Sequence, residues 1–193
     1  MLYLFRYLIK LPILKRLIPS LIKKYIFFLN DYHKEISVNN IFFDLDLRHL
    51  IDRRFYLNRA YEEELFIPLS QIIKDHEANY FFDIGSCWGL YSLRLSNLHK
   101  KMNILSFDPI KKNIDRLKSS VAKNNIINIK IFHTAIGNRN DIVELGATEK
   151  YSPNYAINET NAIIKEKNKI IFLDNMFQFK NKCLVFKIDT EGF

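Results

Sequence analysis

The chain has 193 residues, of which 48% are hydrophobic, and a formal net charge of +8. This length predicts one domain with an additional arm, and the apolar fraction is sufficient for a buried core. The charge is uneven, because residues 1–30 hold six of the 29 basic residues and none of the 21 acidic residues. The rest of the chain is nearly neutral, so the overall basicity does not indicate binding to nucleic acid.

The two cysteines, Cys87 and Cys183, make neither a disulfide framework nor a metal-ligand pattern. We therefore predict no bound metal and a cytoplasmic location, where thiols stay reduced.

Residues 1–30 form a basic arm in which Pro12 and Pro19 would interrupt any single long helix. No uninterrupted apolar run approaches the roughly 18–20 residues that span a bilayer, and no signal-peptide cleavage pattern follows. Two interpretations stay open. The arm is either a short helical segment packed on the domain or an amphipathic segment in peripheral contact with an anionic membrane.

Residues 31–78 are predicted to form a helical cap that leads into the main domain. Within them, apolar and acidic residues alternate in the later part of residues 41–47, so this segment fits either a strand or a packing loop. A helix is predicted from Tyr61 to about Lys74, with acidic residues at its start, where they suit the helix dipole. Its predicted apolar face consists of Leu65, Leu69, Ile72 and Ile73.

Four strands are predicted in residues 79–193, the proposed main domain. They cover residues 80–84, 102–107, 127–133 and 183–188. A polar, irregular stretch is expected after the third strand through Asn161. A short strand at 170–173 and a short helix capped by Asp174 are expected after it.

Two amphipathic helices separate the first three strands. Their predicted apolar faces are Trp88, Tyr91, Leu95 and Leu98 in one, and Ile110, Ile114, Leu117 and Val121 in the other. Strands that alternate with helices through short links form a parallel sheet with right-handed crossovers. The predicted fold class is therefore α/β, a Rossmann-like, mostly parallel sheet flanked by helices and incomplete after the fourth strand.

The first strand ends in Asp83 and continues into a loop with glycines at positions 85 and 89. Gly85 permits a tight turn and lets a ligand approach the backbone. The next helix directs its free N–H groups and the positive end of its dipole at that ligand. Asp83 adds a charged acceptor at the strand tip. The arrangement predicts a nucleotide-type cofactor site at the carboxyl end of a parallel strand.

Asp108 follows the second strand, nineteen residues after Gly89, where an acid can accept hydrogen bonds from a ribose diol. A turn-forming acid before a proline is the open alternative. Dinucleotide loops have the spacing G-x-G-x-x-G, whereas this loop has D-x-G-x-x-x-G. A pyrophosphate is therefore less well matched than an adenosine that carries an amino acid, whose ammonium Asp83 would attract.

Five segments within residues 61–193 resemble the FkbM-type S-adenosylmethionine-dependent methyltransferases in order and spacing. They are FDIGSCWG at 82–89, FDP at 107–109, TAIG at 134–137, LD at 173–174 and KIDTEG at 187–192. The last segment is the most specific, whereas the glycine loop is shared by the whole class I superfamily. The chain differs from the family in having Cys87 where Asn is typical and Asp108 where Glu is typical.

The resemblance implies a class I methyltransferase fold and an enzyme that methylates a hydroxyl of a glycan or small metabolite. The implied cofactor-binding residues are Asp83, Gly85, Ser86, Gly89, Asp108, Ala135 and Ile136. Asp83 and the glycines would hold the methionine part, Asp108 the ribose, and residues 135–136 the adenine. Asp189 and Glu191 would face the methyl group and the acceptor as the catalytic residues, where a carboxylate could act as a general base or orient the acceptor hydroxyl. A structural pairing with Lys187 is the alternative for both acids.

Two other functions stay open: an NAD-type Rossmann oxidoreductase, and a non-catalytic, membrane-associated remnant that still binds cofactor. Class I methyltransferases resemble one another in having a seven-stranded sheet, and this chain stops soon after the fourth strand. The resemblance therefore predicts a C-terminally truncated methyltransferase with an unpaired strand edge and little turnover.

The positive charge of residues 1–30 predicts salt-sensitive binding to anionic membranes. If residues 1–30 lie on an anionic surface, the full chain will co-sediment with vesicles that contain phosphatidylserine, and added salt will release it. A chain that begins at Asp31 should then stay in the supernatant. Equal sedimentation of the two chains would show that the arm is not the membrane-binding segment.

Overall fold

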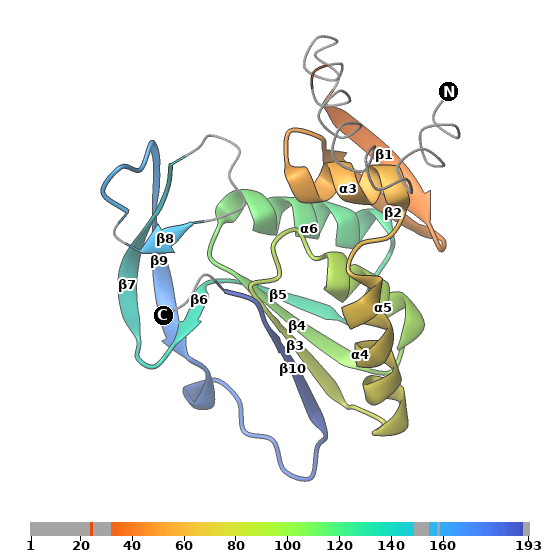
Figure 1. Cartoon of the computed structure of the whole chain (residues 1–193). Helices are drawn as coiled ribbons and strands as arrows, with labels where there is room; N and C mark the ends of the chain where they lie inside the picture. Colours follow the sequence, from red (N-terminus) through yellow and green to blue (C-terminus); the bar gives the residue numbers. More distant parts are fainter. Residues whose placement is uncertain (1–23, 25–31, 149–154, 158, 191–193) are drawn as a thin grey trace. The chain divides into compact units, whose positions relative to one another are not determined.

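The computed structural model describes residues 24, 32–148, 155–157 and 159–190 (Figure 1). The chain divides into two compact units, residues 1–64 and residues 65–193. The predicted arm lies outside the described residues except for Lys24. Among the described residues, no helix is long and apolar enough to cross a membrane.

The first unit contains a β-hairpin formed by β1 (His33–Val38) and β2 (Ile41–Asp46). Asn39 and Asn40 join the strands with φ angles of 51° and 62°. Two-residue hairpin turns require this left-handed conformation, which asparagine tolerates better than most residues. Alternate residues of β2 from Ile41 onward are buried. The segment that fitted either a strand or a loop is thus a strand, so residues 31–78 contain a hairpin as well as helices.

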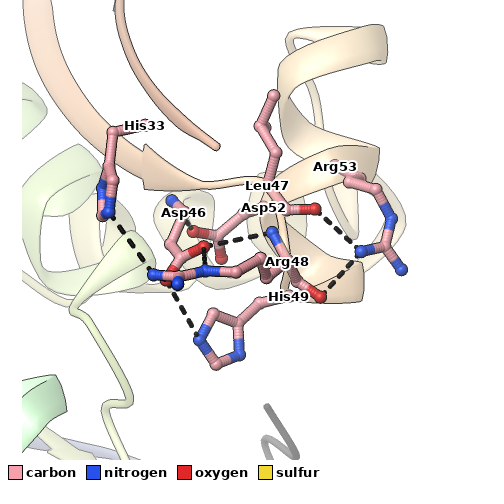
Figure 2. Close-up of polar contacts among 7 residues, drawn as sticks. All are labelled: His33, Asp46, Leu47, Arg48, His49, Asp52 and Arg53. Atoms are coloured by element: carbon pink, nitrogen blue, oxygen red, sulfur yellow. Dashed lines mark hydrogen bonds and ion pairs between the residues drawn. The ribbon is translucent and has the colours of Figure 1, made fainter. Parts of the chain in front are cut away.

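A buried polar network joins β2 to helix α3 (Leu50–Asn58) (Figure 2). The Asp46 carboxylate accepts two hydrogen bonds of 2.7 Å from the Arg48 guanidinium. The Asp52 carboxylate accepts the backbone N–H of Asp46 at 2.7 Å. The Arg53 guanidinium donates to two backbone carbonyls at 2.7 and 2.8 Å. Because charges are costly to bury without partners, these contacts stabilise the start of α3.

Helix α4 (Glu63–Asp75) lies almost entirely in the second unit. Phe66 and Ile73 are its buried side chains, and the Phe66 ring packs against the Tyr91 ring with centroids 5.7 Å apart. The predicted apolar face was wrong for two exposed residues, Leu65 and Ile72. The aromatic contact of Phe66 determines which side of the helix faces the core.

The centre of the second unit is a four-stranded parallel sheet in the order β10-β3-β4-β5 (Figure 1). Its strands are β3 (Tyr80–Ile84), β4 (Asn103–Asp108), β5 (Ile129–His133) and β10 (Leu184–Ile188). Helix α5 (Leu90–Leu98) connects β3 to β4, and helix α6 (Lys111–Lys123) connects β4 to β5. The predicted Rossmann-like α/β class is confirmed, and each predicted strand lies within two residues of the observed one.

The two faces of this sheet pack against different layers. On one face, Phe81 and Ile104 pack with side chains of α4 and α5. On the other face, an aromatic cluster extends across the strands and onto the segment after β9. Its rings belong to Phe82, Phe107, Phe132, Phe177, Phe179 and Phe186. Leu98, predicted to be buried, is exposed at the last turn of α5.

The stretch predicted to be irregular contains β7 (Asp141–Ala147) and β8 (Ala156–Ile157), two strands of a second sheet, so the prediction was wrong for these residues. β7 pairs antiparallel with β9 (Ile164–Phe172), and the order is β6-β9-β7-β8. β6 (Ala135–Gly137) and β8 are short. The expected strand at 170–173 is the end of β9, and the expected helix is one 3₁₀ turn, Leu173–Asn175. β9 is rich in lysine, so it lacks the apolar alternation that identifies strands.

Gly89 precedes α5 with a φ angle of 85°, which favours glycine. A Cβ at this position would collide with the Leu117 side chain of α6. The close approach of α6 to the loop therefore requires the absence of a side chain at position 89.

Gly89→Ala should destabilise the fold by about 2–5 kcal/mol, because left-handed backbone strain contributes roughly 1–2 kcal/mol and overpacking roughly 1–3 kcal/mol. Urea denaturation followed by circular dichroism measures this difference. In a Leu117→Ala background the overpacking should disappear and the strain should stay, so Gly89→Ala should cost less. An equal cost in both backgrounds would show that Leu117 does not limit the space at position 89.

Candidate functional site

The loop between β3 and α5 is held to the end of β4 by hydrogen bonds. Gly85 and Ser86 both donate their backbone N–H groups to the Phe107 carbonyl at 2.9 Å. Cys87, with a φ angle of 51°, donates its backbone N–H to the Asp108 carboxylate at 2.8 Å. The structure therefore brings together the glycine loop and the acid that the sequence placed in one site.

The space beside Gly85 is filled by the chain itself. A Cβ at this position would overlap the backbone carbonyl of Asp189, which follows β10. The backbone N–H of Asp189 in turn donates to the Ile84 carbonyl at 3.0 Å. The sequence predicted that a ligand lies against Gly85, whereas in the structure the Asp189 main chain takes that place. Gly85 is required by the close approach of β10.

Asp83 is fully buried at the end of β3, with 0% of its surface exposed. Its Oδ2 accepts a hydrogen bond of 2.6 Å from the Ser92 hydroxyl on α5. The Ser92 Oγ also lies 2.7 Å from the Ser106 Oγ on β4, and both serines are fully buried. A polar chain of three side chains therefore crosses the otherwise apolar layer between the sheet and α5.

Lys187 on β10 supplies a cation beside the three polar side chains. The parallel register aligns Lys187 with Asp83, so the two side chains point to the same face of the sheet. Lys187 Nζ lies 3.5 Å from Asp83 Oδ1 and 3.2 Å from Asp189 Oδ2. It also lies 5.0 Å from the centre of the Tyr91 ring. One ammonium therefore stands between two of the predicted site acids.

Two buried oxygen atoms of the site have no hydrogen-bond partner among the described residues. They are Asp83 Oδ1 and Ser86 Oγ. Buried polar atoms are nearly always hydrogen-bonded in folded proteins, to the chain, to water or to a ligand. Each of these atoms could therefore accept a hydrogen bond from a ligand that reaches it.

Asp108 is also buried, and its carboxylate is largely engaged by the chain. Oδ1 accepts hydrogen bonds from the Ile110 backbone at 2.9 Å and from the Asn113 amide at 3.1 Å. Among the described residues, Oδ2 accepts one hydrogen bond, from the Cys87 backbone N–H. Burial raises the pKa of Asp108 to about 6, and nearby Asp83 acts in the same direction, whereas these three hydrogen bonds lower it. The turn-forming role that was left open for Asp108 is therefore present in the structure.

The other predicted site residues lie in different surroundings. Ala135 is buried in a small core with Ile110 and residues of β7 and β9. Its neighbour Ile136 packs against the aromatic face of the central sheet. The Asp189 side chain is 72% exposed at the tip of β10. Glu191 lies outside the described residues, so its predicted role stays a prediction.

Sequence reasoning missed Ser92 and Ser106, and it treated Lys187 only as a structural partner. A signal was present, because each of these polar residues interrupts an apolar run that is predicted to be buried. Their convergence on Asp83 depends on packing between elements that are distant in the sequence.

The site lies where the strand order reverses. The chain passes from β3 to β4 and β5 on one side, and β10 then pairs with the other side of β3. Open α/β sheets bind ligands at such a switch point, beyond the carboxyl ends of the strands. Asp83 is the last residue but one of β3, and Asp189 directly follows β10, so both lie at this edge of the sheet.

The sequence matches no known protein-family model and no curated protein. Membership of the FkbM family therefore stays a prediction. Several solved structures resemble part of the fold. TYW2 of M. jannaschii in complex with AdoMet is 13% identical with a TM-score of 0.41, over 52% of this chain and 42% of that protein.

Two further structures show a similar level of likeness. TYW2 of P. horikoshii in complex with MeSAdo is 9% identical with a TM-score of 0.41, over 54% of this chain and 37% of that protein. A tRNA (uracil-54, C5)-methyltransferase of Pyrococcus abyssi in complex with S-adenosyl-L-homocysteine is 13% identical, with a TM-score of 0.37. That match covers 55% of this chain and 28% of the other. The chain spans less than half the length of these three proteins.

The raised pKa of Asp108 predicts a pH-dependent stability. Its folded-state pKa of about 6 lies above the ordinary value of 3.8, so its contribution is complete below about pH 4 and is lost as the pH rises through 6. Asp108→Asn cannot titrate. Between pH 4 and 7 the wild type should therefore lose about 3 kcal/mol relative to this variant, at roughly 1.4 kcal/mol per pKa unit. Urea denaturation of both proteins across this range measures the difference, and a constant difference would contradict the prediction.

Proposed function

We propose that the second unit binds S-adenosylmethionine and transfers its methyl group, as a class I methyltransferase domain. The observation that carries this proposal is the buried Asp83 at the switch point, whose Oδ1 has no hydrogen-bond donor among the described residues. An α-ammonium offers three N–H donors and a positive charge, which is what a buried carboxylate needs.

The charge of the site favours this cofactor over a dinucleotide. Asp83, Asp108 and Asp189 meet at adjacent strand tips, and Lys187 is the cation that contacts two of them. S-adenosylmethionine carries an ammonium, a sulfonium and one carboxylate, so it brings a net positive charge to these acids. The pyrophosphate of NAD would bring two negative charges instead, which raises the electrostatic cost of binding.

Asp108 and Ser86 would complete the cofactor site. Asp108 Oδ2 accepts one hydrogen bond from the chain, so it retains capacity for a ribose hydroxyl, whereas Oδ1 already accepts two. The buried Ser86 hydroxyl can donate to the ligand or accept from it. We propose that the backbone of Ala135 and Ile136 lines the adenine-binding part of the site.

When bound, S-adenosylmethionine supplies an electrophilic methyl group. Methyl transfer depends on alignment of the acceptor and exclusion of water more than on covalent catalysis. The exposed Asp189 side chain is placed to orient an acceptor hydroxyl or accept its proton. We propose a hydroxyl of a glycan or small metabolite as the acceptor, and Glu191 as a second acid.

Isothermal titration calorimetry tests the cofactor. S-adenosylhomocysteine should bind the wild-type chain, and NAD should not. Asp83→Asn and Asp108→Ala should each weaken S-adenosylhomocysteine binding by about 10- to 100-fold, because losing hydrogen bonds to a charged group costs roughly 1.5–3 kcal/mol.

A matched control is Asp115→Asn, which removes an exposed acid from α6 and should leave the affinity unchanged. Wild-type affinity in Asp83→Asn would remove Asp83 from the site. Binding of NAD in preference to S-adenosylhomocysteine would support the oxidoreductase alternative.

A further inference from the structure

The ammonium of Lys187 balances the charge of Asp83 but does not make a good hydrogen bond to its Oδ1. The 3.5 Å separation between Lys187 Nζ and Asp83 Oδ1 is longer than a good N–H···O hydrogen bond, and Oδ1 has no other donor among the described residues. The same ammonium lies closer to Asp189, at 3.2 Å. Lys187 is therefore shared between a buried acid and an exposed one.

We propose that Lys187 is an internal substitute for the ammonium of the ligand. It neutralises Asp83 in the free protein and moves toward Asp189 when a ligand ammonium binds Asp83. This inference rests on the proposed function and deepens it, because it identifies the residue that controls access of the amino-acid end of the cofactor.

The surroundings of Lys187 can accommodate its ammonium beside Asp83 and beside Asp189. Its side chain is 16% exposed, so the ammonium is largely shielded and acts strongly on Asp83. Its flexible stem carries a compact charge that can shift over a short distance. Asp189, whose side chain is exposed, provides the second partner, and the Tyr91 ring offers a surface that attracts a cation in either position.

The arrangement has a consequence for selectivity. Two cations beside one carboxylate repel each other, so Lys187 opposes the placement of an α-ammonium at Asp83, and in this proposal the α-carboxylate of the same ligand lies away from Lys187. It does not oppose 5′-methylthioadenosine, which has the same adenosine and sulfur but no amino-acid end. The ratio of the two dissociation constants therefore isolates the effect of Lys187 from general changes in the site.

Calorimetry with both ligands tests the proposal on the full chain. Lys187→Met should tighten S-adenosylhomocysteine binding by about three- to tenfold, the range expected for a partly shielded charge. Its affinity for 5′-methylthioadenosine should not change. Lys187→Arg should weaken S-adenosylhomocysteine alone, because a guanidinium forms paired hydrogen bonds with a carboxylate and is displaced less readily. Lys182→Met removes an exposed charge just before β10 and should leave both affinities unchanged.

Unchanged or weaker S-adenosylhomocysteine binding by a folded Lys187→Met would overturn the proposal, since Lys187 would then not compete with the ligand. If thermal unfolding shows that this variant does not fold, Lys187→Arg provides the test. A ratio of the dissociation constants for S-adenosylhomocysteine and 5′-methylthioadenosine equal to that of the wild type would then overturn the proposal. Either outcome leaves the proposed function intact when the wild type binds S-adenosylhomocysteine. Failure of every folded variant to bind it would overturn both.

Discussion

The parallel pairing of β10 with β3 is the contact on which the candidate site depends. It joins segments that are far apart in the sequence, and Cys183 donates its backbone N–H to the Asn79 side chain, 104 positions away. The register places Lys187 beside Asp83. A slip of one residue would turn Lys187 to the opposite, aromatic face and leave Asp83 buried without a cation. The same pairing brings the Asp189 carbonyl against Gly85, which explains why position 85 lacks a side chain.

The two buried acids of the site are compensated in different ways. Asp83 has a hydroxyl donor on one oxygen and an ammonium near the other. Asp108 has three neutral donors and no ion pair among the described residues, so burial raises its pKa. Neutral donors reduce the cost of a buried charge less than a cation does. The site is therefore acidic, and it favours a ligand that carries positive charge.

The first unit shows the same physical rule in a structural role. Asp46 and Asp52 are buried there; the Arg48 guanidinium pairs with both oxygens of Asp46, and the Asp46 backbone N–H donates to Asp52 Oδ2 (Figure 2). The Asp46–Arg48 contacts are short and paired, as expected for a carboxylate and a guanidinium. The looser contact between Asp83 and Lys187 stands in contrast to them.

Much of the central fold follows from local sequence patterns. The bounds of β3 were predicted to the residue, because its buried apolar run is followed directly by a turn that contains glycine. The α/β class follows from the alternation of such strands with amphipathic helices. The glycine loop and Asp108 were placed in one site because carboxyl ends of adjacent parallel strands lie side by side.

Only the tertiary structure decided what these residues contact. β9 is a strand because β7 and β6 pair with it, although Glu166 and Asn168 stand between its lysines and the segment therefore lacks apolar alternation. Phe66 instead of Leu65 is buried on α4, because the Tyr91 ring packs against it. Gly85 faces the main chain of Asp189, and Lys187 contacts Asp83, because β10 returns to β3 in one register. Local patterns report periodicity and turn chemistry, whereas partners distant in the sequence are set by packing and long-range strand pairing.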